Sequence, residues 1–394
     1  MARTFGSHPK GHRFESCHAH HFTVANQKLT VCVAVALLLR LAFVFVGFPR
    51  LEQRWHLRDD GDGYGLIAET IRVGHYNDVT RGPVYPAFVA VAGSPLVVKT
   101  AQAVLDTLTV VLVYWLAGRR LLAAWLWAVY PFAIWRVAFI NKEIVLTLLL
   151  ASCVCVQFLA SREKRLWPWL AAGALLGLVN LCKPMFLWWP VVLLAFNPRR
   201  AWLTLATMTL VIAPWTYRNW RVTGGEFLPV ATERGGVTAF IGNYQPTLGL
   251  WEGPGKVIWT AAVDEVKRRH PDASPVQLDR IFYHEAAMTW RNPVPAMLLV
   301  IRKCGRFWFL SAAHREQMMS VVVQAGYLVL LCIGLWRARR WSRDEWMMVA
   351  LIGYVMALHA LSYADLRFSL PVMPYVCVLA ARTFATAKAA TEIS

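Results

Sequence analysis

The chain alternates between long apolar runs and short polar connections over almost its whole length. Apolar segments lie near residues 29–48, 97–117, 121–136, 143–160, 167–183, 185–196, 201–215, 320–336, 346–363 and 369–385. Most of them approach the ~20 helical residues that cross a bilayer core of roughly 30 Å. The sixth segment is short, and Pro131 is expected to kink or end the third. The pattern predicts an all-α polytopic membrane protein with about ten transmembrane helices.

The composition favours a membrane over an aqueous environment. Hydrophobic residues make up 57% of the 394 residues and charged residues only 16%, whereas soluble domains carry about 25% charged residues. A formal net charge of +18 would suggest a nucleic-acid partner in a soluble protein. Here the positive residues form short clusters between apolar runs, without a basic patch that is interleaved with aromatic residues. We therefore expect no nucleic-acid partner.

The basic clusters predict how the chain is oriented in the membrane. They lie in the tail 1–28, at 119–120, 162–165, 199–200 and 337–343, and beside the C-terminal tail 386–394. All of these positions fall on one side of a ten-helix arrangement, and short loops rich in Lys and Arg face the cytoplasm. We expect both termini to be cytoplasmic, with residues 29–385 forming the transmembrane domain of a bacterial plasma (inner) membrane protein.

Two longer connections, 49–96 and 216–319, fall on the opposite, extracytoplasmic side. Both are rich in Gly, Pro, Trp and charged residues, and ordered loops of this length usually carry function. The hydrophobic periodicity predicts short helices within them at Tyr64–Gly74, Val257–Arg269 and Gln277–Trp290.

Two charged residues lie deep inside predicted spans. Arg40 belongs to the first span and Asp106 to the second. A lone charge within the bilayer is costly. We therefore expect Arg40 and Asp106 to form an ion pair with a structural role.

An acidic cluster follows the first span, with Asp59, Asp60 and Asp62 separated by glycine. Such a sequence on its own is typical of a solvated turn. Other spans place charged residues at the same outer level, namely Arg136, Lys142, Glu143, Lys183, Arg218, Asp365 and Arg367. Together these residues predict a pocket in which Arg and Lys bind a phosphate-bearing lipid headgroup beside a carboxylate that accepts a proton.

Several short motifs occur in a fixed order on this topology. They are Asp60-x-x-x-Tyr64, Gly74-His75-Tyr76, Arg81-Gly82-Pro83-Val84-Tyr85-Pro86, Asn141-Lys142-Glu143, Lys183-Pro184, Ala213–Trp220, Gly235-Gly236 through Gly242-Asn243, and Arg367–Pro374. In this order the chain resembles the GT-C-type glycosyltransferases that use polyprenyl-phosphate-linked sugars. Protein O-mannosyltransferases and bacterial aminoarabinose transferases are members of that superfamily.

The resemblance implies transfer of a sugar from a polyprenyl phosphate to a hydroxyl of a lipid, glycan or protein at the outer membrane face. The catalytic base of the family corresponds best to Asp60, with Asp62 and Asp59 as alternatives. The implied ligands of the donor phosphate are Lys183, Arg218, Arg367, Arg81 and Lys142, and the implied supporting residues are Glu143, Tyr64, Tyr85 and Asn243.

Other functions and cofactors are weighed against this expectation. A transporter or flippase of lipid-linked sugars, or a polysaccharide polymerase, would also handle lipid-linked sugars, but the charges gather at one face rather than at the midplane, where transporters bind substrate. The sequence has no Walker-type loop or GxGxxG motif, which disfavours a nucleotide sugar. No cofactor is predicted with certainty, and the outer carboxylates leave a divalent cation open.

Overall fold

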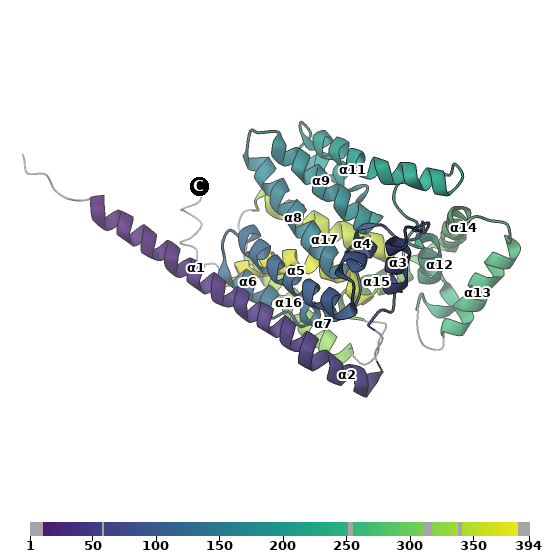
Figure 1. Ribbon diagram of the computed structural model, residues 1–394, viewed down its shortest axis with the longest axis horizontal. Helices are drawn as coiled ribbons and strands as arrows, with labels where there is room; N and C mark the ends of the chain where they lie inside the picture. The colour runs from purple at the N-terminus through teal and green to yellow at the C-terminus, as the bar shows by residue number, and fades with distance from the viewer. Residues whose placement is uncertain (1–10, 57–58, 251–254, 311–316, 338–340, 385–394) are drawn as a thin grey trace, which may run out of the picture.

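A computed structural model describes residues 11–56, 59–250, 255–310, 317–337 and 341–384, and every regular element in these ranges is helical (Figure 1). The predicted tails lie partly outside this description, since it omits 1–10 and 385–394. The predicted all-α fold is confirmed for the described residues.

The first half of the chain forms a long N-terminal helix followed by the helices around the core. Their bounds are α1 Gly11–Ala42, a π-helical stretch Phe43–Gly47, α2 Phe48–Trp55, α3 Tyr64–Arg72, α4 Val84–Ala92, α5 Pro95–Leu116, α6 Leu121–Ala128, α7 Pro131–Arg136, α8 Glu143–Arg162, α9 Trp167–Cys182 and α10 Trp189–Phe196.

The second half begins with a further long helix and then forms an outer group of shorter helices. The elements are α11 Ala201–Val222, α12 Gly235–Asn243, α13 Gly255–Arg269, α14 Pro275–Met288, α15 Pro293–Phe309, α16 Gln317–Arg337, α17 Arg343–Leu361, a 3₁₀ segment Leu366–Val372 and α18 Met373–Ala380. The short helices predicted in the two outer loops are confirmed as α3, α13 and α14, with ends shifted by about two residues.

Local sequence explains where many helices begin. Proline occupies the first turn of α5, α7, α9, α14 and α15, where its missing N–H has no intrahelical partner to lose. Capping boxes start α14 at Ser274 with Gln277 and α17 at Ser342 with Glu345.

Four helices are long and apolar enough to cross a membrane, judged by length and composition. They are Asn26–Arg54, Pro95–Leu116, Glu143–Arg162 and Arg343–Leu361. Shorter apolar helices occupy Trp167–Cys182, Pro184–Phe196 and Val321–Arg337. An integral membrane protein is therefore supported, whereas the count of ten spans stays a prediction. The third predicted span is not one continuous helix. α6 stops at Ala128, and α7 begins at Pro131.

One large apolar core unites most of these helices. α9 packs between α8 and α11, and α5 packs against α1, α6 and α8. A second, smaller core lies apart in the group α12–α14, where Phe240, Val266 and Phe282 are buried together. Figure 1 shows this group at one end of the molecule, beside α3 and α15.

The basic loops predicted to be cytoplasmic contact one another at one end of the helices. Arg162 forms an ion pair with Asp344 at 2.6 Å, and Arg382 forms one with Glu345. Arg200 donates hydrogen bonds to the carbonyls of Glu163 and Lys164, which also belong to these loops. α8 therefore runs from this basic end, at Arg162, to the opposite end, at Lys142 and Glu143.

The predicted pair between Arg40 and Asp106 is confirmed. Arg40 Nε lies 2.5 Å from Asp106 Oδ2, and both side chains are fully buried. The guanidinium also donates to the carbonyls of Ala36, Ala128 and Trp127 at 3.0, 2.8 and 3.3 Å. The pair thus fastens α1 to α5 and α6.

Candidate functional site

Asp60 caps the helix that follows it. Its Oδ1 accepts a hydrogen bond from the Tyr64 amide at 2.8 Å, and its Oδ2 accepts one from the Gly65 amide at 2.7 Å. Between them Gly63 adopts φ +74°, a left-handed conformation that favours glycine. Both carboxylate oxygens of Asp60 are therefore committed to satisfying the first amides of α3.

Asp59 is also committed to the scaffold. Its Oδ2 lies 2.8 Å from Lys99 Nζ in α5, and its carbonyl oxygen accepts a hydrogen bond from the Ile140 amide at 2.8 Å. Asp59 thus ties the acidic loop to the start of α5 and to the loop before α8.

Asp62 faces a set of positive side chains from distant parts of the chain. Its Oδ2 lies 3.4 Å from Arg367 Nη1, and the side chains of Asp62 and Arg367 are 28% and 32% exposed. Burial alone raises the pKa of Asp62, but the charges of Arg367, Arg81, Lys142 and Arg136 outweigh it and hold that pKa below its usual value. Asp62 is therefore an ionised carboxylate that remains partly open to solvent.

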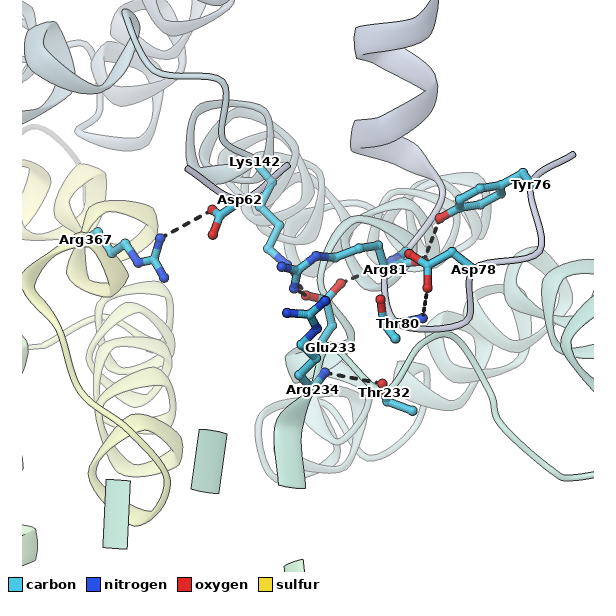
Figure 2. A network of polar contacts seen from close by, with 11 residues as sticks. Asp62, Tyr76, Asp78, Thr80, Arg81, Lys142, Thr232, Glu233, Arg234 and Arg367 are labelled. Atoms are coloured by element: carbon cyan, nitrogen blue, oxygen red, sulfur yellow. Dashed lines mark hydrogen bonds and ion pairs between the residues drawn. The ribbon is translucent and has the colours of Figure 1, made fainter. Parts of the chain in front are cut away.

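Glu233 is the centre of the cation cluster. Its carboxylate forms ion pairs with Lys142 and with Arg81, the latter at 3.5 Å, and accepts a hydrogen bond from the Gly82 amide at 3.1 Å. Figure 2 shows Lys142 and Arg81 meeting at Glu233, while Arg367 points toward Asp62. Three separate segments of the chain thus meet at Glu233.

Close backbone packing fixes the loop that carries Arg81. A Cβ atom on Gly82 would overlap the carbonyl oxygen of Leu181 near the end of α9, so only glycine fits there. The Tyr76 hydroxyl donates to the Arg81 carbonyl at 2.9 Å. The loop therefore lies directly against the helix end that is followed by Lys183.

Lys183 and Arg367 share an aromatic support. Lys183 Nζ lies 4.3 Å from the centre of the Phe368 ring, and the Arg367 guanidinium carbon lies 4.9 Å from the same centre. His359 stacks on Phe368 with ring centres 4.2 Å apart. The aromatic column thus brings Lys183 close to Arg367.

Glu143 is buried and incompletely bonded. Its side chain belongs to the first residue of α8, and its Oε2 has no hydrogen-bond partner among the described residues. Burial lowers the pKa of Arg367, but the carboxylates of Asp62 and Glu143 raise it above its usual value. Glu143 therefore contributes negative charge to the same cluster.

Arg218 instead braces a loop. It donates to the carbonyls of Asp78, at 3.0 Å, and Tyr76, and its guanidinium lies 4.5 Å from the centre of the Trp215 ring. Because these donors bind backbone carbonyls, Arg218 stabilises the loop that leads to Arg81 rather than facing Asp62.

The predicted supporting residues Tyr64, Tyr85 and Asn243 connect helices. Tyr64 and Tyr85 are buried with ring centres 4.6 Å apart, and the Tyr85 hydroxyl donates to Gln102 in α5 at 2.8 Å. Asn243 donates to the carbonyl of Leu361 at 2.9 Å and accepts from Lys303 at 2.9 Å. They hold α3, α4 and α12 in place around the cluster.

Sequence reasoning missed Glu233 and Lys99. Glu233 precedes the Gly235-Gly236 motif by two residues, but no spacing rule connects it with Arg81, which lies 152 residues away. A weak signal existed, because an acidic residue in an outer loop that faces several predicted cations is a natural partner for them.

A divalent cation at the outer carboxylates stays a prediction. Among the described residues no three His, Cys, Asp or Glu side chains lie close enough to hold a metal ion. Asp62 and Glu233 already face Arg367, Arg81 and Lys142, whereas Ca²⁺ and Mg²⁺ need sets of oxygen ligands free of competing cations.

Comparison with known proteins supports the fold. No family model and no curated relative matches the sequence. Two solved structures of the oligosaccharyltransferase AglB from the archaeon Archaeoglobus fulgidus do match. One, in complex with an inhibitory peptide and a dolichol-phosphate, has a TM-score of 0.55 and 16% identity over 91% of this chain and 50% of the other. The other, tethered to an acceptor peptide with an NVT sequon, has a TM-score of 0.54 and 15% identity over 91% and 49%.

The fold is similar to that of the oligosaccharyltransferase AglB. The predicted resemblance is thereby confirmed at the level of the fold, which is what a likeness at this identity shows. The chain spans about half the length of the matched structures.

Proposed function

We propose that this protein is a membrane glycosyltransferase that moves a sugar from a polyprenyl-phosphate donor to a hydroxyl acceptor at the extracytoplasmic face. The observation that carries the proposal is the partly exposed, ionised Asp62 beside Arg367 and near Lys142 and Arg81. A carboxylate able to accept a proton, next to cations able to bind a phosphate, matches the needs of this reaction. The shared fold with AglB supports the same class of chemistry.

In the proposed reaction the acceptor hydroxyl oxygen attacks the anomeric carbon of the sugar as the carbon–oxygen bond to phosphate breaks. The sugar inverts its configuration, Asp62 takes the hydroxyl proton late in the step, and the polyprenyl phosphate leaves. Asp62 suits this role better than Asp60 or Asp59, because both oxygens of Asp60 bind backbone amides and Asp59 pairs with Lys99.

Charge moves toward the cations during this step. The donor phosphate is a diester with one negative charge, and the leaving monoester carries up to two at neutral pH. Arg367, Lys142, Arg81 and Lys183 lie where they would stabilise that additional charge. Arg218 supports the site indirectly through its loop.

The cluster's place in the fold supports an outer-face site. Lys142 and Glu143 start α8, whereas Arg162 ends it among the basic loops. We infer from the positive-inside rule that those loops are cytoplasmic and that Asp62 lies on the outer side. A bacterial plasma membrane with both termini in the cytoplasm is part of this proposal.

Transport of a lipid-linked sugar is less well supported. Transporters place ionisable residues at the bilayer midplane, where the substrate binds. Here the deep charges, Arg40 and Asp106, bind each other and nearby carbonyls. Polymerisation of a glycan would use the same chemistry as sugar transfer. Only analysis of the product distinguishes the two reactions.

The test is transfer of labelled sugar in proteoliposomes from a panel of polyprenyl-phosphate donors, with lipid, glycan and peptide acceptors. The double variant Asp62→Asn with Arg367→Gln serves as the inactive reference. With the wild type we expect one donor to be consumed and an acceptor to become labelled. With the double variant we expect neither. Movement of intact donor across the bilayer, without consumption, would replace transfer by transport.

A further inference from the structure

Glu233 links three segments of the candidate site although it belongs to none of the predicted catalytic positions. It bonds to Arg81 and Gly82 in the loop before α4 and to Lys142 at the start of α8, and its own loop leads into α12. Its side chain is only 13% exposed. Removing either partner of such a buried ion pair leaves an unpaired charge and is strongly destabilising.

The backbone at Glu233 is held in an unusual conformation. Glu233 and Arg234 have φ of +52° and +51°, the left-handed region that costs residues other than glycine about 1 kcal/mol or more each. Neighbouring bonds hold this bend, because the Thr232 amide donates to the Val79 carbonyl at 3.0 Å and the Arg234 amide to the Thr232 hydroxyl at 3.3 Å. Strain of this kind gathers at functional sites.

The bend directs the Glu233 carboxylate toward Arg81 and Lys142, as Figure 2 shows. Burial raises the pKa of Glu233, but Lys142, Arg81 and the Gly82 amide outweigh burial and hold it below its usual value. The carboxylate therefore stays charged at neutral pH. Lys142 and Arg81 are long side chains that would otherwise sample many rotamers.

We propose that Glu233 is a positioning residue. It orients Lys142 and Arg81 so that their remaining N–H donors can bind the phosphate of the lipid-linked substrate. Lysine has three such donors and arginine five. Glu233 accepts one hydrogen bond from each of the two side chains, which leaves the other donors for a ligand. This inference rests on the proposed function, because the phosphate belongs to that donor.

The variant Glu233→Gln keeps the shape and the bond from Gly82 but removes the charge. We expect it to raise KM for the donor and to weaken binding of decaprenyl phosphate by about 10- to 100-fold, the scale of effect of a small misplacement of binding groups. The change in kcat and the KM for the acceptor should be smaller. Glu233→Asp should restore part of the donor affinity.

The matched control is Asp344→Asn, which removes one partner of the ion pair with Arg162 at the other end of α8. It should leave decaprenyl phosphate affinity unchanged. A double-mutant cycle with Lys142→Gln measures whether Glu233 acts through Lys142, in which case the two losses are not additive.

The outcomes separate the two proposals. Unchanged donor affinity in folded Glu233→Gln, with an active wild type, would overturn the positioning role alone. A wild type that binds decaprenyl phosphate without transferring sugar would overturn the proposed reaction and still test Glu233 through binding. A lower melting temperature with unchanged donor affinity would make Glu233 merely structural.

Discussion

Arginine and carboxylate groups meet in two regions of this molecule, and the two regions differ in how far the charges are exposed to solvent. Between α1 and α5, Arg40 binds Asp106 and three backbone carbonyls, all fully buried. In the second region, Asp62 lies 3.4 Å from Arg367, and both side chains are partly exposed to solvent.

This difference in solvent exposure indicates a different role for each region. A buried pair with no room for a ligand stabilises helix packing and can do little else. The second region places Arg81, Lys142 and Arg367 around Asp62 and Glu233, and its side chains are partly exposed. Such an arrangement suits an incoming anion.

The largest effect on stability should come from the buried pair. Asp106→Ala leaves the Arg40 charge unpaired within the core, which typically costs about 3–5 kcal/mol of unfolding free energy. We expect a sharply lower melting temperature in detergent. The double variant Arg40→Met with Asp106→Leu should recover most of the loss, and a stable Asp106→Ala protein would contradict the structural role.

A smaller, pH-dependent effect is expected at Asp279 in α14. Burial raises its pKa to about 6, although a hydrogen bond from the Gly236 amide lowers it. A carboxyl with a raised pKa adds stability that is complete below about pH 4, the unfolded value, and is lost as pH rises through about 6.

Between pH 4 and pH 7 the wild type should therefore lose about 1–2 kcal/mol of unfolding free energy, a value discounted for partial exposure. Asp279→Asn should not show this loss. Melting temperatures across that range measure it, with the exposed Asp264→Asn as the control. An identical pH dependence in Asp279→Asn and wild type would show that this carboxyl does not destabilise α14.

The smallest effect should follow from removing the helix cap. Asp60→Ala leaves the Tyr64 and Gly65 amides without their acceptor, and loss of a cap costs about 1 kcal/mol. We expect a modestly lower melting temperature. Hydrogen exchange confined to α3 would locate the change, and equal protection of α3 in both proteins would contradict the capping role.

The sequence predicted the features that follow from local pattern. Apolar runs predicted the helices, and the cost of a lone buried charge predicted the pairing of Arg40 with Asp106. The acidic loop and the basic residues around it were predicted to meet, and Asp62, Arg367, Lys142 and Arg81 do so.

The remaining features depend on tertiary geometry. Spacing alone could not separate Asp60 from Asp62, because the choice depends on α3 beginning at Tyr64 and using Asp60 as its cap. Glu233 escaped prediction because its role requires a left-handed bend at two non-glycine residues. Arg218 donates to a backbone carbonyl of a distant loop, a contact that spacing could not predict, and its binding of phosphate stays a prediction.

The most direct test of the account compares transfer by Asp62→Asn and Asp60→Asn in the same proteoliposome assay, with melting temperatures for both. We predict that Asp62→Asn melts like the wild type but transfers about 10²- to 10⁴-fold more slowly, whereas Asp60→Asn melts lower and keeps most of its transfer rate. Full activity in Asp62→Asn, with transfer lost in a folded Asp60→Asn, would contradict the account.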